Sequence, residues 1–337
     1  MDQATSFTSS RSQLLDRIET VTIESFESVA LDVFRFQAAH NPVYASFLSL
    51  LGVHPSHIQR LEKIPCLPIS LFKTHQLQTG SWEPEKIFTS SGTTGAATSR
   101  HYVRSTSWYD HLALRTFEQA YGPIRDYVVL ALLPAYLERT GSSLVHMAQH
   151  FIQASAKKAS GFYLDDYDAL EEQLRTCAQN KQPTLLLGVS FALWDLAERG
   201  VTGFPELTVM ETGGMKGRRR ELTRSELHGI LAPTFRQKKI HSEYGMTELL
   251  SQAYSTGNGL FEPGATMRVW MREPTDPFAP VKSGKTGAIN VIDLANIDSI
   301  SFIATDDLGR SCDDGCFEVL GRLDASDVRG CNLLVLE

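Results

Sequence analysis

Segments with strand and helix patterns alternate along the middle of the chain, and this alternation limits the fold more than any other feature. Strands are expected at 86–89, 127–133, 161–164, 184–187, 206–210 and 239–242. Helices are expected between them at 105–121, 142–156, 167–179 and 190–200, and again after 223, where Thr223 and Glu226 form a capping box. This pattern predicts an α/β fold with a doubly wound, mostly parallel sheet covered by helices.

The two ends of the chain do not continue this alternation of strands and helices. The first 85 residues predict helices at 14–20, 24–38 and 43–51, the last of them opened by Asn41 as N-cap and Pro42 at the first helical position. After residue 250, short strands at 267–271, 288–293, 300–305 and 317–320 predict a small antiparallel subdomain. We therefore expect a helical lead-in (1–85), an α/β core (86–250) and a β-rich subdomain (251–337) that complete one domain.

Composition limits the class of protein. The 337 residues carry a net charge of −7, with 42% hydrophobic and 21% charged residues, which excludes a disordered or fibrous chain. The acidic balance argues against a dedicated nucleic-acid binder. Neither a secretory leader nor a membrane-spanning segment is expected. Five cysteines are an odd, sparse set that favours reduced thiols in a cytoplasm.

A loop rich in hydroxyls and glycine follows the strand expected at 86–89. Glycine allows the backbone N–H groups of such a loop to approach an oxyanion, and hydroxyls add donors or a metal ligand. It lacks the spacing and the terminal Lys-Ser/Thr of a Walker loop. A flexible surface loop is the simpler alternative, but Arg100 and His101 just beyond it favour anion binding. The loop residues are Ser90, Ser91, Gly92, Thr93, Thr94 and Gly95.

Two further clusters carry groups suited to a nucleotide. In 241–248, Tyr244 can stack on a base, while Thr247 and Glu248 can hold Mg²⁺ or order its waters. In 305–310, Asp307 can bind a ribose diol, and Arg322 follows nearby. Taken singly, each has an ordinary alternative, namely a strand-to-helix corner and an acidic β-turn.

The order of the three clusters resembles the adenylate-forming superfamily of acyl-CoA ligases and related enzymes. The resemblance implies the large core of that fold, with ATP and Mg²⁺ as cofactors. It implies that the Ser/Thr/Gly loop holds the phosphates, that 244–248 contacts adenine and magnesium, and that Asp307 and Arg322 serve the ribose. Glu248 and Thr94 are the implied magnesium ligands. The other implied nucleotide-binding residues are Gly213, Gly214, Glu243, Gly245 and Met246.

A closer resemblance is to the acyl-protein synthetases (LuxE-type). It is carried by 88–95 with 99–101, by 212–219 and by 243–249; the tail, 321–332, is also similar to phenylacetate–CoA ligases. The resemblance implies ATP-dependent activation of a carboxylic acid, a fatty or other apolar one, followed by acyl transfer to a thiol. That thiol is an enzyme cysteine, a partner or acyl carrier protein, or CoA. Cys331, close after Arg329, is the candidate cysteine; a small apolar packing role is the alternative.

The sequence departs from the superfamily in one respect. Full-length ligases continue into a C-terminal lid domain with a catalytic lysine, and this sequence ends at Glu337, so we expect that domain to be absent. Another cation is then needed beside the α-phosphate, unless a partner protein completes the site. The candidates are Arg100, His101, Lys216 and, last, Arg310; the first three are the catalytic candidates besides Cys331. A CoA ligase of the phenylacetate type and a non-catalytic scaffold for a reductase or synthase remain as alternatives.

Overall fold

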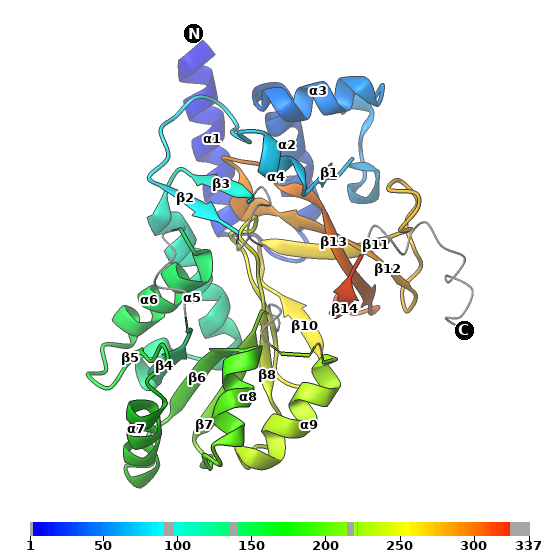
Figure 1. Cartoon of the computed structure of the whole chain (residues 1–337). Helices are drawn as coiled ribbons and strands as arrows, with labels where there is room; N and C mark the ends of the chain where they lie inside the picture. Colours follow the sequence, from blue (N-terminus) through cyan, green and yellow to red (C-terminus); the bar gives the residue numbers. More distant parts are fainter. Residues whose placement is uncertain (1–2, 91–97, 135–140, 214–218, 221, 324–337) are drawn as a thin grey trace.

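The computed structural model of the chain describes residues 3–90, 98–134, 141–213, 219–220 and 222–323. Within these residues one 12-stranded sheet runs through the molecule in the order β11-β12-β13-β14-β10-β9-β8-β7-β6-β4-β5, and β1 pairs with β13 beside this path. Figure 1 shows this sheet continuing from the helix-covered lower half into the upper half.

The lower half is the parallel part of the sheet. Its strands are β4 (Val128–Leu132), β5 (Gly161–Phe162), β6 (Thr184–Val189), β7 (Leu207–Thr212) and β8 (His241–Tyr244). Neighbouring pairs along β5-β4-β6-β7-β8 are all parallel. Every residue of β4 and β6 is buried, as expected for strands covered on both faces.

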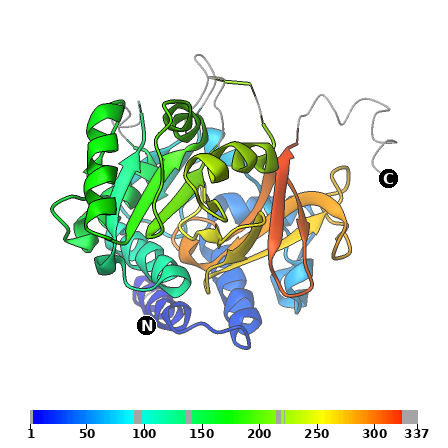
Figure 2. The same ribbon diagram turned by 90° about the horizontal axis from the view of Figure 1, so that it is seen from below.

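Helices connect these strands and cover the two faces of the sheet. They are α5 (Thr106–Tyr121), α6 (Ser143–Ser155), α7 (Tyr167–Gln179), α8 (Ser190–Glu198) and α9 (Arg224–Thr234), with the short η3 (Ile124–Asp126) before β4. Figure 2 shows α5 on one side of the strands and α8 and α9 on the other. The expected α/β alternation is confirmed, and the capping box of Thr223 and Glu226 does begin α9.

The upper half of the sheet is antiparallel. Its strands are β9 (Ala253–Ser255), β10 (Leu260–Pro263), β11 (Met267–Arg272), β12 (Thr286–Asp293), β13 (Phe302–Ser311) and β14 (Phe317–Arg322), with η4 (Leu294–Asn296) after β12. The expected antiparallel strands are present, but they extend the same sheet, because β9 pairs antiparallel with β8. The sequence pattern missed the short strands β9 and β10.

The N-terminal segment packs on this antiparallel half. It contains α1 (Gln3–Glu19), α2 (Phe26–His40), α3 (Pro42–Leu50), η1 (Pro55–His57), η2 (Leu61–Lys63), β1 (Leu67–Pro68) and α4 (Leu71–Thr74). The buried Gln37 amide donates to the carbonyl oxygens of Asn296 at 3.0 Å and Ile297 at 3.1 Å, and so ties α2 to η4. Asn41 caps α3 as expected, with Pro42 at its first position.

A separate two-stranded hairpin, β2 (Lys86–Thr89) with β3 (Arg100–Val103), lies between the two halves. The side chain of Phe88 on β2 is fully buried and belongs to the core of the lower half. Among the helices of the described residues, none combines the length and the apolar character that a membrane span requires.

Candidate active site

The Ser/Thr/Gly loop connects strands β2 and β3 in the sequence. Antiparallel pairing places Thr89 opposite Arg100 and Phe88 opposite His101. The Ser90 amide donates to the Ser99 carbonyl oxygen at 3.1 Å, and the Ser99 amide donates to Ser90 Oγ at 2.9 Å. These bonds close the base of the loop. Its predicted phosphate-binding residues Ser91, Gly92, Thr93, Thr94 and Gly95 lie outside the described residues.

His101 is buried and joins two of the predicted clusters. Its Nδ1 lies 2.9 Å from the Thr247 carbonyl oxygen, so this nitrogen carries the proton, and its Nε2 lies 2.9 Å from Ser299 Oγ. Burial lowers the pKa of His101 to about 4, so the ring is neutral at pH 7. The sequence suggested a cation facing phosphate; in the structure, His101 instead holds the backbone of 244–248 against the hairpin.

Tyr244 joins the second cluster to the third. Its hydroxyl donates to Asp307 Oδ2 at 2.9 Å, although the two residues are 63 positions apart. The Tyr244 ring packs edge-on against Phe317, with ring centroids 5.3 Å apart. Asp307 Oδ1 lies 3.8 Å from Nε of Arg322, its partner across β13 and β14. A carboxylate has several acceptor positions, so Asp307 can hold Tyr244 and still accept ribose hydroxyls.

Glu248 lies beside the same group of residues. Burial raises its pKa, a hydrogen bond from Ser99 and the charge of Arg322 partly offset this, and the charge of Asp307 adds to it. Burial also raises the pKa of Asp307, against the hydrogen bond from Tyr244. A bound cation would favour the ionised forms of these two neighbouring carboxyl groups, which burial disfavours, so the pair is suited to a cationic ligand.

The donor set fits magnesium bound through a nucleotide. Mg²⁺ is usually held by one or two carboxylates, several waters and substrate phosphates, not by a cage of protein ligands. In the described part of the chain no group of three or more metal-binding side chains lies together. Glu248 with Asp307 nearby agrees with that kind of site, and the residues present fit ATP with Mg²⁺.

The other predicted site residues either lie near these clusters or fall outside the described residues. Gly213 directly follows β7 with a positive φ of 70°, a backbone conformation that favours glycine. Arg100 is exposed at the start of β3, where the Ser/Thr/Gly loop ends. Met246 accepts a backbone hydrogen bond from Leu249 at 3.1 Å. Gly214, Lys216 and Cys331 lie outside the described residues.

Glu243 points to the opposite face of β8 from its neighbours in sequence. Thr212 Oγ1 on β7 donates to Glu243 Oε2. Burial, opposed by this hydrogen bond and assisted by the charge of Glu211, raises the pKa of Glu243 to about 7. Gly245 leaves room for it, because a Cβ at that position would collide with Glu243 Oε1.

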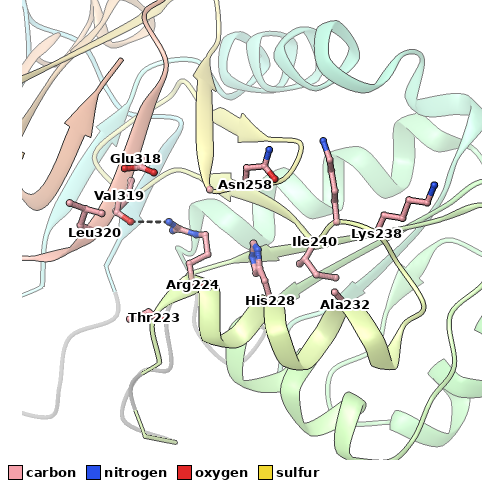
Figure 3. Close-up of a pocket in the computed structure, with 13 residues that line it drawn as sticks. Thr223, Arg224, His228, Ala232, Lys238, Ile240, Asn258, Glu318, Val319 and Leu320 are labelled. Carbon is pink, nitrogen blue, oxygen red and sulfur yellow. Dashed lines mark hydrogen bonds between the residues drawn. The ribbon is translucent and has the colours of Figure 1, made fainter. Parts of the chain in front are cut away.

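On the α9 side, a charged network supports the same strands. Arg224 Nε donates to Glu211 Oε1 at 3.0 Å, and another of its nitrogens, Nη1, donates to the Val319 carbonyl oxygen at 2.9 Å. Figure 3 shows Arg224 reaching from α9 to β14 across a pocket of about 430 Å³. Arg224 thus links the parallel half of the sheet to the antiparallel half.

Sequence reasoning placed Ser99 and Thr212 in segments that carry the family resemblance but gave neither a role, and it missed Arg224 and Tyr254 as residues of this region. Thr212 and Tyr254 flank Glu243 on β7 and β9. Only the pairing of the strands brings them together, and no sequence motif predicts that pairing. Arg224 directly follows the N-cap Thr223, but its partner Val319 is 95 positions away.

No protein-family model matches the sequence, and no curated protein matches it either. Solved structures do share its fold. A 2-hydroxyisobutyryl-CoA ligase, in an open conformation with 2-HIB-AMP and CoA, superimposes with a TM-score of 0.67 at 13% identity, over 89% of this chain and 70% of the ligase. ATP-bound MatB from Rhodopseudomonas palustris gives 0.51 at 17% identity, over 81% of this chain and 51% of MatB. The likeness establishes that the chain has the mixed α/β core fold of the adenylate-forming ligases, as the sequence predicted.

Proposed function

We propose that the chain uses ATP with Mg²⁺ to convert a carboxylic acid into its acyl-adenylate, releasing pyrophosphate. The observation that carries the proposal is the convergence of three separate sequence clusters. Tyr244 bonds to Asp307, His101 bonds to Thr247, and Ser99, just beyond the Ser/Thr/Gly loop, lies close enough to Glu248 to lower its pKa against the effect of burial. The shared fold of ATP- and AMP-bound ligase structures supports the same activity.

In this proposal the side chains have distinct tasks. Asp307 accepts the ribose hydroxyls, and Tyr244 holds the Asp307 carboxylate in place. Glu248 and the hydroxyl of Thr94 hold Mg²⁺ or its waters, which offset the charge of the phosphates. Residues 90–95, with Arg100, donate to the phosphate oxygens.

The reaction itself needs charge stabilisation more than acid–base chemistry. A carboxylate oxygen of the acid attacks the α-phosphorus, and the bond to the pyrophosphate oxygen breaks. Negative charge builds on the α-phosphate during this step, so donors and cations must already be in position. Arg100 and Lys216 are the cations that we propose for it, whereas the neutral His101 positions the backbone of Thr247.

For the second half-reaction we propose transfer of the acyl group to a thiol. A thiolate attacks the acyl carbon of the adenylate, and AMP leaves. The resemblance to acyl-protein synthetases favours a fatty or other apolar acid, Cys331 as the first acceptor, and a reductase or carrier protein as the next. CoA is the second candidate acceptor, favoured by the structurally similar ligase that was solved with 2-HIB-AMP and CoA.

Acid-dependent exchange of labelled pyrophosphate into ATP tests the first half-reaction. We expect exchange with at least one carboxylic acid, and a kcat/KM about 10–100-fold lower for Asp307→Asn, because hydrogen bonds to a charged group are lost. Asp306→Asn is the matched control, since it neutralises the adjacent carboxylate. Absence of exchange over a range of acid chain lengths would refute adenylate formation and favour the scaffold.

The acceptor is tested separately. Incubation with ATP and labelled acid should give a hydroxylamine-labile acyl group on the wild-type chain, lost in Cys331→Ser and retained in Cys312→Ser. If the label appears only on added CoA, the chain is a CoA ligase and the cysteinyl step is wrong.

A further inference from the structure

Three polar side chains lie next to one another across strands β7, β8 and β9. Strand register places Thr212 beside Glu243 in the parallel pair, and Glu243 opposite Tyr254 in the antiparallel pair. Directly paired residues project from the same face of a sheet. We refer to Thr212, Glu243 and Tyr254 as the polar ladder.

The polar ladder is buried under α5. Thr212 is 4%, Glu243 8% and Tyr254 2% exposed. From α5, Phe117 packs edge-on against the Tyr254 ring at 6.0 Å between centroids, and Tyr109 lies near enough for the Glu243 charge to add to the effect of burial on its pKa. Polar groups are therefore arranged in a row along an otherwise aromatic wall.

Hydrogen bonding within the polar ladder is incomplete. Thr212 Oγ1 donates to Glu243 Oε2, but the buried Tyr254 hydroxyl has no hydrogen-bond partner among the described residues. The nearby Gln252 Oε1 is buried and likewise unpaired within that set. Buried polar groups in folded proteins are almost always paired, so a phenol beside a carboxyl group, without a partner among the described residues, leaves a position for a polar group of a ligand.

The polar ladder begins at the edge of the sheet where the candidate nucleotide residues lie. Thr212 directly precedes Gly213 at the carboxyl end of β7, and Glu243 directly precedes Tyr244, whose hydroxyl bonds to Asp307. In open α/β sheets, ligands bind outside the carboxyl ends of the strands. The polar ladder therefore starts next to the position at which an acid would be held for attack on a nucleotide at this edge.

We infer that the polar ladder recognises a hydroxyl group on the acid substrate, with Tyr254 donating to the hydroxyl oxygen and the hydroxyl donating to Glu243. The inference rests on the proposed function and narrows its substrate class to hydroxy acids. A hydroxyl both accepts and donates, so it satisfies both side chains. A plain alkyl chain would satisfy neither, and an ammonium group would leave the Tyr254 proton without an acceptor.

The test compares pairs of acids of equal chain length, with and without one hydroxyl, at several chain lengths and hydroxyl positions. For the best pair, the wild-type chain should show a kcat/KM in pyrophosphate exchange at least about 100-fold higher for the hydroxy acid, because sites built to bond a hydroxyl reject analogues that lack it. In Tyr254→Phe and in Glu243→Gln this ratio should fall at least about 10-fold.

Tyr121→Phe is the matched control, because Tyr121 stacks edge-on against Tyr254 at 5.5 Å and its hydroxyl lies 3.2 Å from His241 Nδ1. It should keep the wild-type ratio. A purely structural role for the polar ladder would instead lower kcat/KM equally for both members of each pair and leave the ratio unchanged.

The outcomes separate the two proposals. If plain acids support exchange as well as every hydroxy acid does, the inference is overturned and the proposed function is kept. The same holds if an acid with an amino group in place of the hydroxyl is preferred. If no acid supports exchange, the proposed function fails, and calorimetric titration of the same pairs into wild type and Tyr254→Phe decides the inference. Tighter binding of a hydroxy acid that is lost in the variant supports it, and equal binding of both members refutes it.

Discussion

Two buried glutamates on neighbouring strands have opposite electrostatic surroundings. Glu211 on β7 faces α9, and Glu243 on β8 faces α5. Burial alone would raise both pKa values. For Glu211, the contact with His228, whose Nε2 lies 3.6 Å from Glu211 Oε1, and the charge of Arg224 more than offset burial, so the pKa of Glu211 is lowered. Among the described residues, Glu243 has a single hydroxyl donor, Thr212, and its pKa rises to about 7.

The difference separates a face whose carboxylate is paired from the face that we propose binds the acid substrate. On the α9 side, the carboxylate is paired, and the pair links the two halves of the sheet. On the α5 side, a carboxyl group and a phenol lie next to each other without full pairing. Because incomplete pairing reduces stability, its presence beside the candidate active site agrees with a binding role.

The largest effect is expected from removing the charge partner of Glu211. Arg224→Met should lower the free energy of unfolding by about 3–5 kcal/mol, because it leaves a buried carboxylate without its cation. Urea denaturation measures this. Lys238→Met, an exposed lysine of the same pocket, is the control and should change stability by less than about 0.5 kcal/mol. Equal losses in both variants would show that Glu211 and Arg224 are not coupled.

The second effect concerns the pH dependence of Glu243. Its folded-state pKa of about 7 exceeds the usual 4.5, so the folded chain binds more protons than the unfolded chain in that window. The contribution of Glu243 to the free energy of unfolding is fully present below pH 4.5, where the carboxyl group is protonated in both states. It is lost as pH rises through 7, a change of about 3 kcal/mol. Denaturation of wild type and Glu243→Gln across this range should show that fall in the wild-type chain alone. Parallel curves would contradict the raised pKa.

Smaller effects on the free energy of unfolding, opposite in sign, are expected from substituting two neighbouring tyrosines. Tyr254→Phe removes an unpaired buried hydroxyl and should raise the free energy of unfolding by about 1 kcal/mol in ligand-free protein. Tyr121→Phe removes a hydroxyl that contacts His241 and should lower it by about 1 kcal/mol. Thermal unfolding of the two variants measures both signs. A loss of stability in Tyr254→Phe would mean that its hydroxyl is already paired.

The smallest effect is expected at the start of α9. Thr223→Ala removes the side chain that accepts from the Glu226 amide at 3.2 Å, and should cost about 0.5–1 kcal/mol. Because Arg224 follows directly, the loss should depend on Arg224 being present. A double-mutant cycle with Arg224→Met tests this, and strictly additive losses would show that the cap does not position the arginine.

The predictable part of the candidate active site is the part carried by contiguous residues. The loop from Ser90, the segment from Tyr244 to Glu248 and the turn at Asp307 could be recognised because each groups chemically suited side chains within a few positions. The role of His101 could not be predicted. Its neutrality follows from burial, which outweighs the opposing effect of the Thr247 hydrogen bond on the pKa. Its partners Thr247 and Ser299 are 146 and 198 positions away.

Sequence alone determined the local structure of this protein. Runs of apolar residues set the buried strands β4 and β6, and side chains next to the helix ends set the caps at Asn41 and Thr223, because these interactions join residues a few positions apart. Tertiary structure decided that the antiparallel strands continue the parallel sheet through β8 and β9. It also decided which carboxyl groups are paired, because the pKa of Glu211 or Glu243 depends on burial and on partners from other strands and helices.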